Sequence, residues 1–284
     1  MATILKGAPV VAAMNERNAA LCEQLKAKGV VPTLAVVRVG EREDDLSYER
    51  GVIARCGKVG VEVKHFLLPA DASQDELLKV IAAVNAEDAI HGCLLFRPLP
   101  KQFDDRTVRA ALAPEKDIDG ITDSSLAGVF TNTDLGYAPC TAQACLEILK
   151  YYGIPLSGRR AVVVGRSLVV GKPAAMMLDR ENATVTICNS RTRNLPALCR
   201  EADVVVVAMG KMGAVGADCL REGQTVVDVG IHVNEEGKLC GDVKFAEAEP
   251  IVDAITPVPG GVGTVTTSVL VGHVVQAAAK KIGL

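Results

Sequence analysis

A glycine-bounded turn between an apolar strand and a helix is the first feature of the chain that could hold a charged ligand. The apolar run 160–164 leads into Gly165-Arg166-Ser167-Leu168-Val169-Val170-Gly171-Lys172-Pro173, from which helical spacing continues. A strand, a glycine turn and a helix start direct backbone N–H groups toward a phosphate. The two glycines stand six residues apart and do not form a regular GxGxxG pattern. A tight strand–helix turn that needs glycine for its backbone is therefore the alternative.

The segment after the next strand indicates which nucleotide would bind. In NAD-binding folds, an acid about 20 residues beyond the glycine turn holds the ribose 2′-hydroxyl. Here the expected strand Thr184–Cys188 is followed by Asn189-Ser190-Arg191-Thr192-Arg193, which contains no acid. Hydroxyl and guanidinium groups suit a 2′-phosphate, and Arg166 can join them. The segment predicts NADP rather than NAD, with a solvated charge cluster as the alternative.

Two further loops have compositions that suit a flat ring. Thr256-Pro-Val-Pro-Gly-Gly-Val-Gly263 is a rigid loop with little side-chain bulk, which lets a ring approach the backbone closely. Pro114-Glu-Lys-Asp-Ile-Asp-Gly120 carries two carboxylates two residues apart, and these could hydrogen-bond an aminopyrimidine. Each loop is also compatible with a purely structural turn.

Alternating strands and helices must position these loops. Apolar runs predict strands at 33–39, 61–68, 91–96, 160–165, 184–188, 202–208 and 225–229. Helical spacing predicts helices at about 44–58, 75–86, 141–152, 171–180 and 265–281. Such alternation is typical of βαβ units with parallel sheets. We expect two α/β units with a boundary near Pro139, a C-terminal helix that packs back on the first unit, and a ligand cleft between the units.

Composition narrows the classes of function. The 284 residues carry 31 Lys and Arg against 34 Asp and Glu, with no long basic run, which disfavours binding to nucleic-acid phosphates. With no Trp, four Tyr and five Phe, a base-stacking platform is also disfavoured. Nine scattered cysteines lack a CxxC pair, and neither a signal-peptide stretch nor an apolar run of about 18 residues is evident. We expect a cytoplasmic, soluble protein with buried thiols, no metal site and no membrane span.

Together these segments resemble the bifunctional FolD family, methylenetetrahydrofolate dehydrogenase/methenyltetrahydrofolate cyclohydrolase. The matching stretches keep the family's order and spacing, at 114–120, 139–141, 165–173, 188–192, 228–231, 241–243 and 255–263. The resemblance implies an N-terminal α/β folate domain over residues 1–139, completed by residues 265–284, and a Rossmann-type NADP-binding domain over residues 140–264. It also implies a homodimer that acts on tetrahydrofolate derivatives in one-carbon metabolism and purine biosynthesis.

The resemblance also implies roles for individual residues. Tyr48 would stack on or border the folate and Asp119 would bind the pterin, and these two are the expected catalytic residues. The other expected folate contacts are Val52, Phe96, Pro259 and Gly260. The expected NADP contacts are Cys140, Thr141, Gly165, Arg166, Ser167, Ser190, Arg191, Ile231 and Thr266.

Two departures from the family pattern concern the hydrolase activity. The family helix reads Ser-x-x-Tyr-x-x-x-Lys, and that lysine is assigned to the cyclohydrolase. Here Tyr48 is present, but Asp45 stands at the serine position and Val52 at the lysine position. The glutamine that partners the lysine is replaced by Phe96. Arg97 is the best substitute cation, although in an extended segment its side chain should point away from that of Phe96.

The two reactions of the family make different demands on the protein. Hydride transfer from the folate to NADP depends on positioning and needs no proton relay from the protein. Hydrolysis of the methenyl product needs an activated water and a proton shuttle. We therefore predict an NADP-dependent methylenetetrahydrofolate dehydrogenase with weak or lost cyclohydrolase activity. The alternatives are a bifunctional enzyme with a substitute residue, a folate-binding protein with both activities impaired, and another NADP-dependent oxidoreductase on this fold.

Overall fold

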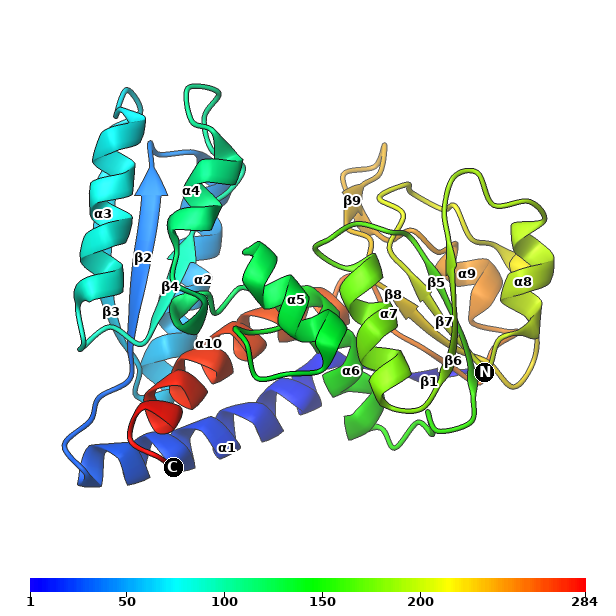
Figure 1. The fold of residues 1–284 in the computed structure, drawn as a ribbon. Helices are drawn as coiled ribbons and strands as arrows, with labels where there is room; N and C mark the ends of the chain where they lie inside the picture. The colour runs from blue at the N-terminus through cyan, green and yellow to red at the C-terminus, as the bar shows by residue number, and fades with distance from the viewer. The chain divides into compact units, whose positions relative to one another are not determined.

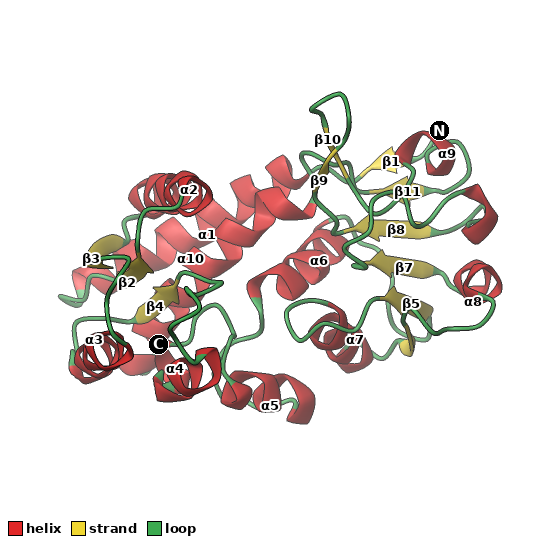
Figure 2. Ribbon diagram, turned by 90° about the horizontal axis from the view of Figure 1, so that it is seen from above, coloured by secondary structure: helices red, strands yellow, loops and turns green.

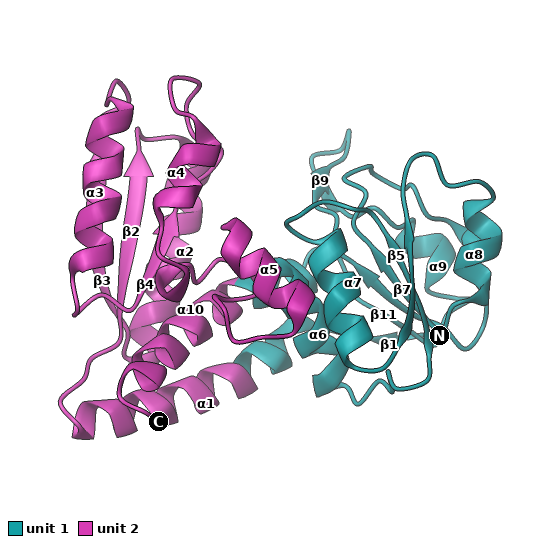
Figure 3. Cartoon of the chain, viewed as in Figure 1, with its two compact units in different colours: residues 1–12, 141–266 teal, residues 13–140, 267–284 magenta.

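The computed structural model describes all residues from Met1 to Leu284, which fold into two compact units (Figures 1 and 3). Unit 1 comprises residues 1–12 and 141–266, and unit 2 comprises residues 13–140 and 267–284. The chain passes between the units within helix α1 (Gly7–Ala27), at the start of helix α6 (Cys140–Tyr151) and within helix α10 (Val262–Lys281). The domain boundaries expected from the sequence stay a prediction.

Unit 2 is built on a three-stranded parallel sheet with the order β3-β2-β4. Its strands are β2 (Thr33–Val39), β3 (Glu62–Leu68) and β4 (Gly92–Leu95). Its other helices are α2 (Glu43–Val59), α3 (Gln74–Ala86), α4 (Asp105–Ala111) and α5 (Asp123–Thr131), with a short 3-10 turn at Pro114–Lys116. Side chains alternate along β2. Ala35, Val37 and Val39 join the buried cluster of α3 and α4, whereas Arg38 on the opposite face binds Glu49 of α2.

Helix α3 begins directly after Ser73, which forms a capping box with Glu76. The Ser73 hydroxyl accepts a hydrogen bond from the Glu76 N–H, and the Glu76 carboxylate accepts one from the Ser73 N–H. This reciprocal pair satisfies two N–H groups that a helix leaves without partners. Downstream, Leu77, Ile81 and Val84 are buried at helical spacing. A capped start and one apolar face therefore place α3 against the sheet.

Unit 1 is a six-stranded parallel sheet with the order β1-β11-β8-β7-β5-β6. The strands are β1 (Thr3–Ile4), β5 (Arg160–Val164), β6 (Thr184–Cys188), β7 (Val204–Val207), β8 (Thr225–Asp228) and β11 (Ala254–Ile255). A separate antiparallel hairpin joins β9 (His232–Val233) to β10 (Leu239–Cys240). Helices α6 and α7 (Gly171–Arg180) lie on one side of the sheet, and α8 (Leu195–Glu201) and α9 (Phe245–Ala248) lie on the other (Figure 2).

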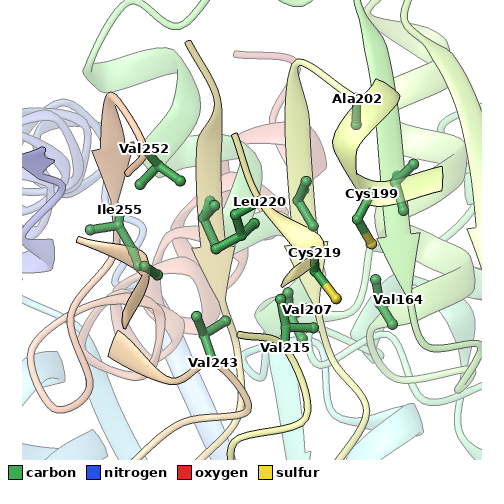
Figure 4. Close-up of a cluster of buried hydrophobic side chains, with 14 of the residues drawn as sticks. Val164, Cys199, Ala202, Val207, Val215, Cys219, Leu220, Val243, Val252 and Ile255 are labelled. Carbon is green, nitrogen blue, oxygen red and sulfur yellow. The ribbon is translucent and has the colours of Figure 1, made fainter. Parts of the chain in front are cut away.

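β-Branched side chains of the central strands form part of the core of unit 1. Val162, Val164, Val205, Val207 and Val226 are buried in one cluster with residues of the surrounding helices and loops (Figure 4). A parallel sheet covered on both faces buries both faces of its strands, so these strands are continuous apolar runs. The predicted α/β fold, with parallel sheets and a returning C-terminal helix, is confirmed.

The return of α10 to unit 2 is visible in specific contacts. Gly272 of α10 lies so close to α1 that an added Cβ would be 3.2 Å from the Asn18 side chain. Near the end of the helix, the Lys281 ammonium group binds the Asp88 carboxylate at 2.7 Å. By length and composition α10 could cross a membrane, a feature absent from our expectations, but 72% of its most apolar window is buried inside the protein. Packing accounts for its apolar character.

Cysteines contribute to the cores as thiols. All nine are free, eight are buried and Cys240 is half-buried. For eight of the nine this confirms the prediction that they are small apolar residues of the interior.

Replacing two glycines of unit 2 by alanine should change the free energy of unfolding in opposite directions. At Gly92 a Cβ would lie 2.6 Å from the Ile118 side chain, whereas at Gly57, inside α2, it would meet nothing within 4 Å. We expect Gly92→Ala to lower the free energy of unfolding by about 1–3 kcal/mol through overpacking. Gly57→Ala should raise it by about 0.5–1 kcal/mol, because alanine favours a helix interior. Denaturant unfolding measures both, and a stable Gly92→Ala protein would contradict the packing described here.

Candidate functional site

The turn after β5 leaves no space for side chains at its two glycines. Gly165 has a φ of +138°, and a Cβ on it would lie 2.1 Å from the Ala208 carbonyl oxygen. A Cβ on Gly171 would lie 2.3 Å from the Gly165 carbonyl oxygen. Between them, the Ser167 hydroxyl oxygen accepts hydrogen bonds from the N–H groups of Val170 and Gly171 at 3.1 and 3.4 Å. Glycine is therefore required at both ends, and the Ser167 O–H is free to donate to a ligand.

The cations expected to bind a 2′-phosphate lie at the ends of adjacent strands. Parallel pairing of Val164 with Cys188 makes the chain leave β5 and β6 side by side. Arg166 follows the first strand, and Ser190 and Arg191 follow the second; all three are exposed. Neither guanidinium group forms an ion pair, and no carboxylate occurs among residues 189–193. Two unpaired cations and a hydroxyl thus fit an anion at this edge of the sheet.

The loop at residues 256–263 lies at the same carboxyl edge of unit 1. The Gly260 carbonyl accepts a hydrogen bond of 2.7 Å from the Gly7 N–H, and Gly260 has a φ of +98°. Pro259 and Gly260 are exposed. Ile231, which is 59% exposed although apolar, has its Cδ1 3.0 Å from where a Cβ on Gly263 would stand. The structure therefore brings Ile231 beside this loop.

Two other expected cofactor contacts belong to helix starts of unit 1. Thr266 is half-buried in the first turns of α10, and its hydroxyl donates to the Val262 carbonyl at 3.3 Å. Thr141 is half-buried at the start of α6.

Tyr48 of α2 is the centre of a second group of side chains, all within unit 2. Its ring meets the Phe96 ring edge-on, with the ring centroids 6.0 Å apart, and its hydroxyl hydrogen-bonds Thr267. Burial of the phenol, followed by the nearby Asp119 and Cys140, raises the pKa of Tyr48 above its ordinary value. The structure thus brings Tyr48, Phe96, Asp119 and Cys140 together. Thr267 was not expected, and no sequence signal distinguishes it from Thr266.

Asp119 is a carboxylate held in a poorly solvated place. Burial, with a smaller repulsion from Asp117, raises its pKa to about 6, although the Cys140 side chain and the charge of Arg97 act in the opposite direction. The Cys140 thiol itself donates to the Ile118 carbonyl at 3.3 Å. Burial and the neighbouring Asp119 raise the pKa of Cys140 well above that of a free thiol. Cys140 thus stays a neutral donor. Near pH 7 Asp119 is mostly ionised and can accept N–H donors from a ligand.

Asp117, the other carboxylate of this segment, has a structural role instead. It is fully buried and accepts hydrogen bonds from the N–H groups of Ile121 and Thr122 at 2.9 and 2.8 Å and from the Ser125 hydroxyl at 2.6 Å. These bonds shape the loop before α5. Of the two carboxylates that could have bound an aminopyrimidine, only Asp119 is available.

The resemblance places Val52 and Phe96 at the lysine and glutamine positions of the family pattern, and both side chains are apolar and buried. Val52, one helical turn after Tyr48, is fully buried, and Phe96 is 7% exposed. Arg97 turns away from Phe96 and binds the Asp105 carboxylate through two hydrogen bonds of 2.6 and 2.7 Å. Its guanidinium is therefore already occupied.

Buried acids in unit 1 are the residues that the sequence analysis missed. Asp228 and Asp242 accept backbone N–H groups from the loops at the carboxyl edge of the sheet. Both belong to stretches noted only as family matches. The signal that could have revealed them is a glycine beside each acid, Gly230 and Gly241, since close backbone approach to a carboxylate requires glycine.

A doubly wound parallel sheet with a glycine turn and unpaired cations at its carboxyl edge is typical of a dinucleotide-binding protein. Residues 139–282 match the model of the tetrahydrofolate dehydrogenase/cyclohydrolase NAD(P)-binding domain, and residues 5–119 match the catalytic domain of the same family. The chain belongs to the tetrahydrofolate dehydrogenase/cyclohydrolase family.

Relatives agree with this assignment over their full length. The chain is 52% identical over 279 residues to the bifunctional protein FolD of Carboxydothermus hydrogenoformans, covering 98% of this chain and 97% of that protein. The bifunctional FolD structure from Campylobacter jejuni superposes with a TM-score of 0.95 at 34% identity, covering 99% and 100% of the two chains. The Trypanosoma brucei FolD structure, a complex with NADP and an inhibitor, has a TM-score of 0.91 at 31% identity, covering 100% and 99%.

Asparagine substitutions distinguish the two carboxylates of the 114–120 loop. Asp117→Asn turns one of the two oxygens that accept these three hydrogen bonds into an NH₂ group and should lower the free energy of unfolding by about 1–3 kcal/mol. Asp119→Asn should not destabilise the protein at neutral pH. Because the folded-state pKa of Asp119 exceeds its ordinary value, its stabilising contribution is complete at low pH and is lost as pH rises through about 6. Thermal unfolding between pH 4 and 8 tests this, and equal losses in both variants would refute the distinction.

Proposed function

We propose that the chain is an NADP-dependent 5,10-methylenetetrahydrofolate dehydrogenase whose cyclohydrolase activity is weak or absent. The observation that carries this proposal is the apolar, buried pair Val52 and Phe96 beside Tyr48, at the positions where the family pattern has lysine and glutamine. The folate domain would comprise residues 1–139 and 265–284, and the NADP-binding domain residues 140–264. The protein would act in the cytoplasm as a homodimer.

NADP fits the residues at the carboxyl edge of unit 1. Gly165, Ser167 and Gly171 would hold the pyrophosphate close to the backbone, and Arg166 with Arg191 would hold the 2′-phosphate. A carboxylate in this place would repel that phosphate, and residues 189–193 contain none. The T. brucei relative is a complex with NADP, which supports the same choice. When bound, NADP would supply the acceptor for the hydride.

The folate would be held and oriented by unit 2. The Asp119 carboxylate would accept N–H donors of the pterin ring, and the Tyr48 ring would border it. Loss of a hydride from the methylene carbon leaves a cation that the folate nitrogens share, so the protein's task is to fix the geometry. No residue needs to give or take a proton in this step, and the replacement of the lysine does not impair it.

Hydrolysis of the methenyl product makes a demand that this neighbourhood meets poorly. Water must be activated and a proton carried to the opening ring. The side chains around Tyr48 are apolar at positions 52 and 96, and the thiol of Cys140 and the phenol of Tyr48 have raised pKa values. Neither releases a proton near pH 7. A site without this lysine favours release of the methenyl product, which a separate hydrolytic enzyme would then consume.

A bifunctional enzyme is the second candidate, and it has its own support. The C. hydrogenoformans and C. jejuni relatives are both described as bifunctional. Asp119, with a pKa near 6, could exchange a proton with water at neutral pH. Arg97 acts on the same carboxylate, although its ion pair with Asp105 holds it elsewhere. The two candidates differ in one measurable rate, that of methenyl hydrolysis.

Restoring the family residues should restore hydrolysis. The double variant Val52→Lys, Phe96→Gln should hydrolyse 5,10-methenyltetrahydrofolate at least about tenfold faster than the natural protein, because a lysine enclosed by apolar groups can exchange protons near neutral pH. Val52→Met with Phe96→Leu is the matched control, which alters volume without adding a polar group. Loss of methenyl absorbance measures the rate. A natural protein that already hydrolyses as fast as the double variant would favour the bifunctional candidate.

The 2′-phosphate assignment predicts a change in cofactor preference. Arg166→Ala should weaken NADP binding by about ten- to one-hundredfold and leave NAD binding nearly unchanged, since NAD lacks the phosphate. Arg180→Ala, at the exposed far end of α7, is the control and should change neither affinity. Titration calorimetry with both dinucleotides gives the ratio. Equal weakening of both would show that Arg166 does not contact the 2′-phosphate.

A further inference from the structure

A single carboxylate at the carboxyl edge of unit 1 collects four hydrogen bonds. Asp242 is fully buried, and its Oδ2 accepts the N–H groups of Met209 and Gly210 at 2.6 and 2.9 Å. Its Oδ1 accepts the Lys211 N–H at 2.8 Å and the His232 Nε2 at 2.7 Å. Three of these donors belong to the loop after β7, and the fourth belongs to β9. Asp242 therefore ties two separate segments to one point.

A second buried acid holds Asp242 itself in place. Asp228, the last residue of β8, accepts the N–H groups of Gly230, Asp242 and Val243, each at 3.0 Å. The approach is so close that a Cβ on Gly241 would lie 1.8 Å from the Asp228 carboxylate, and one on Gly230 would lie 2.5 Å from that of Asp242. The carboxylates of Asp228 and Asp242, with the close contacts at Gly230 and Gly241, therefore connect the loops that follow β7 and β8; we call these four residues the clasp.

The clasp lies on a defined side of the proposed cofactor site. In the strand order β8-β7-β5-β6, the turn after β5 would hold the pyrophosphate and the end of β6 the adenosine ribose. The other half of an extended dinucleotide must then lie toward the ends of β7 and β8. The loops there, 208–211 and 229–232, are those that Asp242 and Asp228 hold, and Ile231 belongs to the second. The two acids are thus positioned to shape the binding of the nicotinamide half.

We propose that Asp242 is a positioning residue for the nicotinamide half of NADP, acting through the loops after β7 and β8 without touching the cofactor. This rests on the proposed function, because it requires NADP at the carboxyl edge of unit 1. Loss of the carboxylate would leave the three N–H groups of residues 209–211 without their acceptor. It would also remove the hydrogen bond from His232, which fixes the residue next to Ile231. The adenosine half, held by the ends of β5 and β6, would keep its contacts.

The test compares a whole dinucleotide with half of one. Asp242→Asn keeps the size of the side chain, but one carboxylate oxygen becomes an NH₂ group that faces N–H donors. Calorimetry would measure the binding of NADP and of adenosine 2′,5′-bisphosphate, which lacks the nicotinamide half, to the full chain. Asp203→Asn is the matched control: Asp203 also accepts a backbone N–H, that of Arg160 at 2.9 Å, but at the amino edge of the same sheet. His232→Phe removes one of the four donors and serves if Asp242→Asn does not fold.

We expect Asp242→Asn to weaken NADP binding by at least about tenfold while the bisphosphate changes by less than about twofold, and His232→Phe to shift in the same direction by a smaller factor. Asp203→Asn should lower thermal stability without changing the ratio of the two affinities. Equal weakening of both ligands, or a loss of stability with no change in either affinity, would overturn the positioning role. A different outcome would refute the proposed function itself: if the natural protein binds NADP and the bisphosphate no more tightly than it binds NAD, then NADP is not its preferred cofactor.

Discussion

Buried carboxylates that accept backbone N–H groups fix the loops on which both proposed sites depend. In unit 2, Asp117 shapes the segment that presents Asp119. In unit 1, Asp228 and Asp242 join the loops at the ends of β7 and β8. The N–H groups of a loop are not paired within a helix or a sheet, so a charged acceptor that binds two or three of them is a strong restraint. Residues of the proposed sites can therefore belong to loops and still be held in one conformation.

The buried carboxylates thus have two kinds of role: some accept hydrogen bonds from the protein and fix a loop, and Asp119 is available to a ligand. Asp117 accepts three hydrogen bonds from the protein, whereas Asp119 lies beside Cys140 and has a pKa raised to about 6. Beside it, Val52 and Phe96 keep the neighbourhood of Tyr48 apolar. In the function we propose, this environment orients a folate and permits hydride loss without the lysine that the family pattern assigns to hydrolysis. The proposed loss of the cyclohydrolase rests on this apolar pair, whereas the relatives from C. hydrogenoformans and C. jejuni are described as bifunctional.

Local sequence patterns predicted many of the strands and helices, but they did not predict which buried carboxylates fix the loops. The β5, β6 and α7 ranges agree with the prediction because β-branched runs and glycines mark their ends. Helix α1 was missed; its first turn has no acidic residue to mark the start. The strands β1 and β11 are two residues long and exist only through pairing between distant parts of the chain. Likewise, nothing local separates Asp117 from Asp119, and the partners of Asp242 come from two other segments, so only tertiary contacts reveal these roles.

The most direct measurement follows NADPH and 5,10-methenyltetrahydrofolate separately while the purified protein oxidises 5,10-methylenetetrahydrofolate with NADP. The two products have distinct absorbance, so one progress curve reports both hydride transfer and hydrolysis. We predict that NADPH forms and that the methenyl product accumulates, declining only at its rate in enzyme-free buffer. If NADPH forms while the methenyl product disappears faster than in buffer, another residue has taken the place of the lysine. The central claim, that Val52 and Phe96 separate the two activities, would then be wrong.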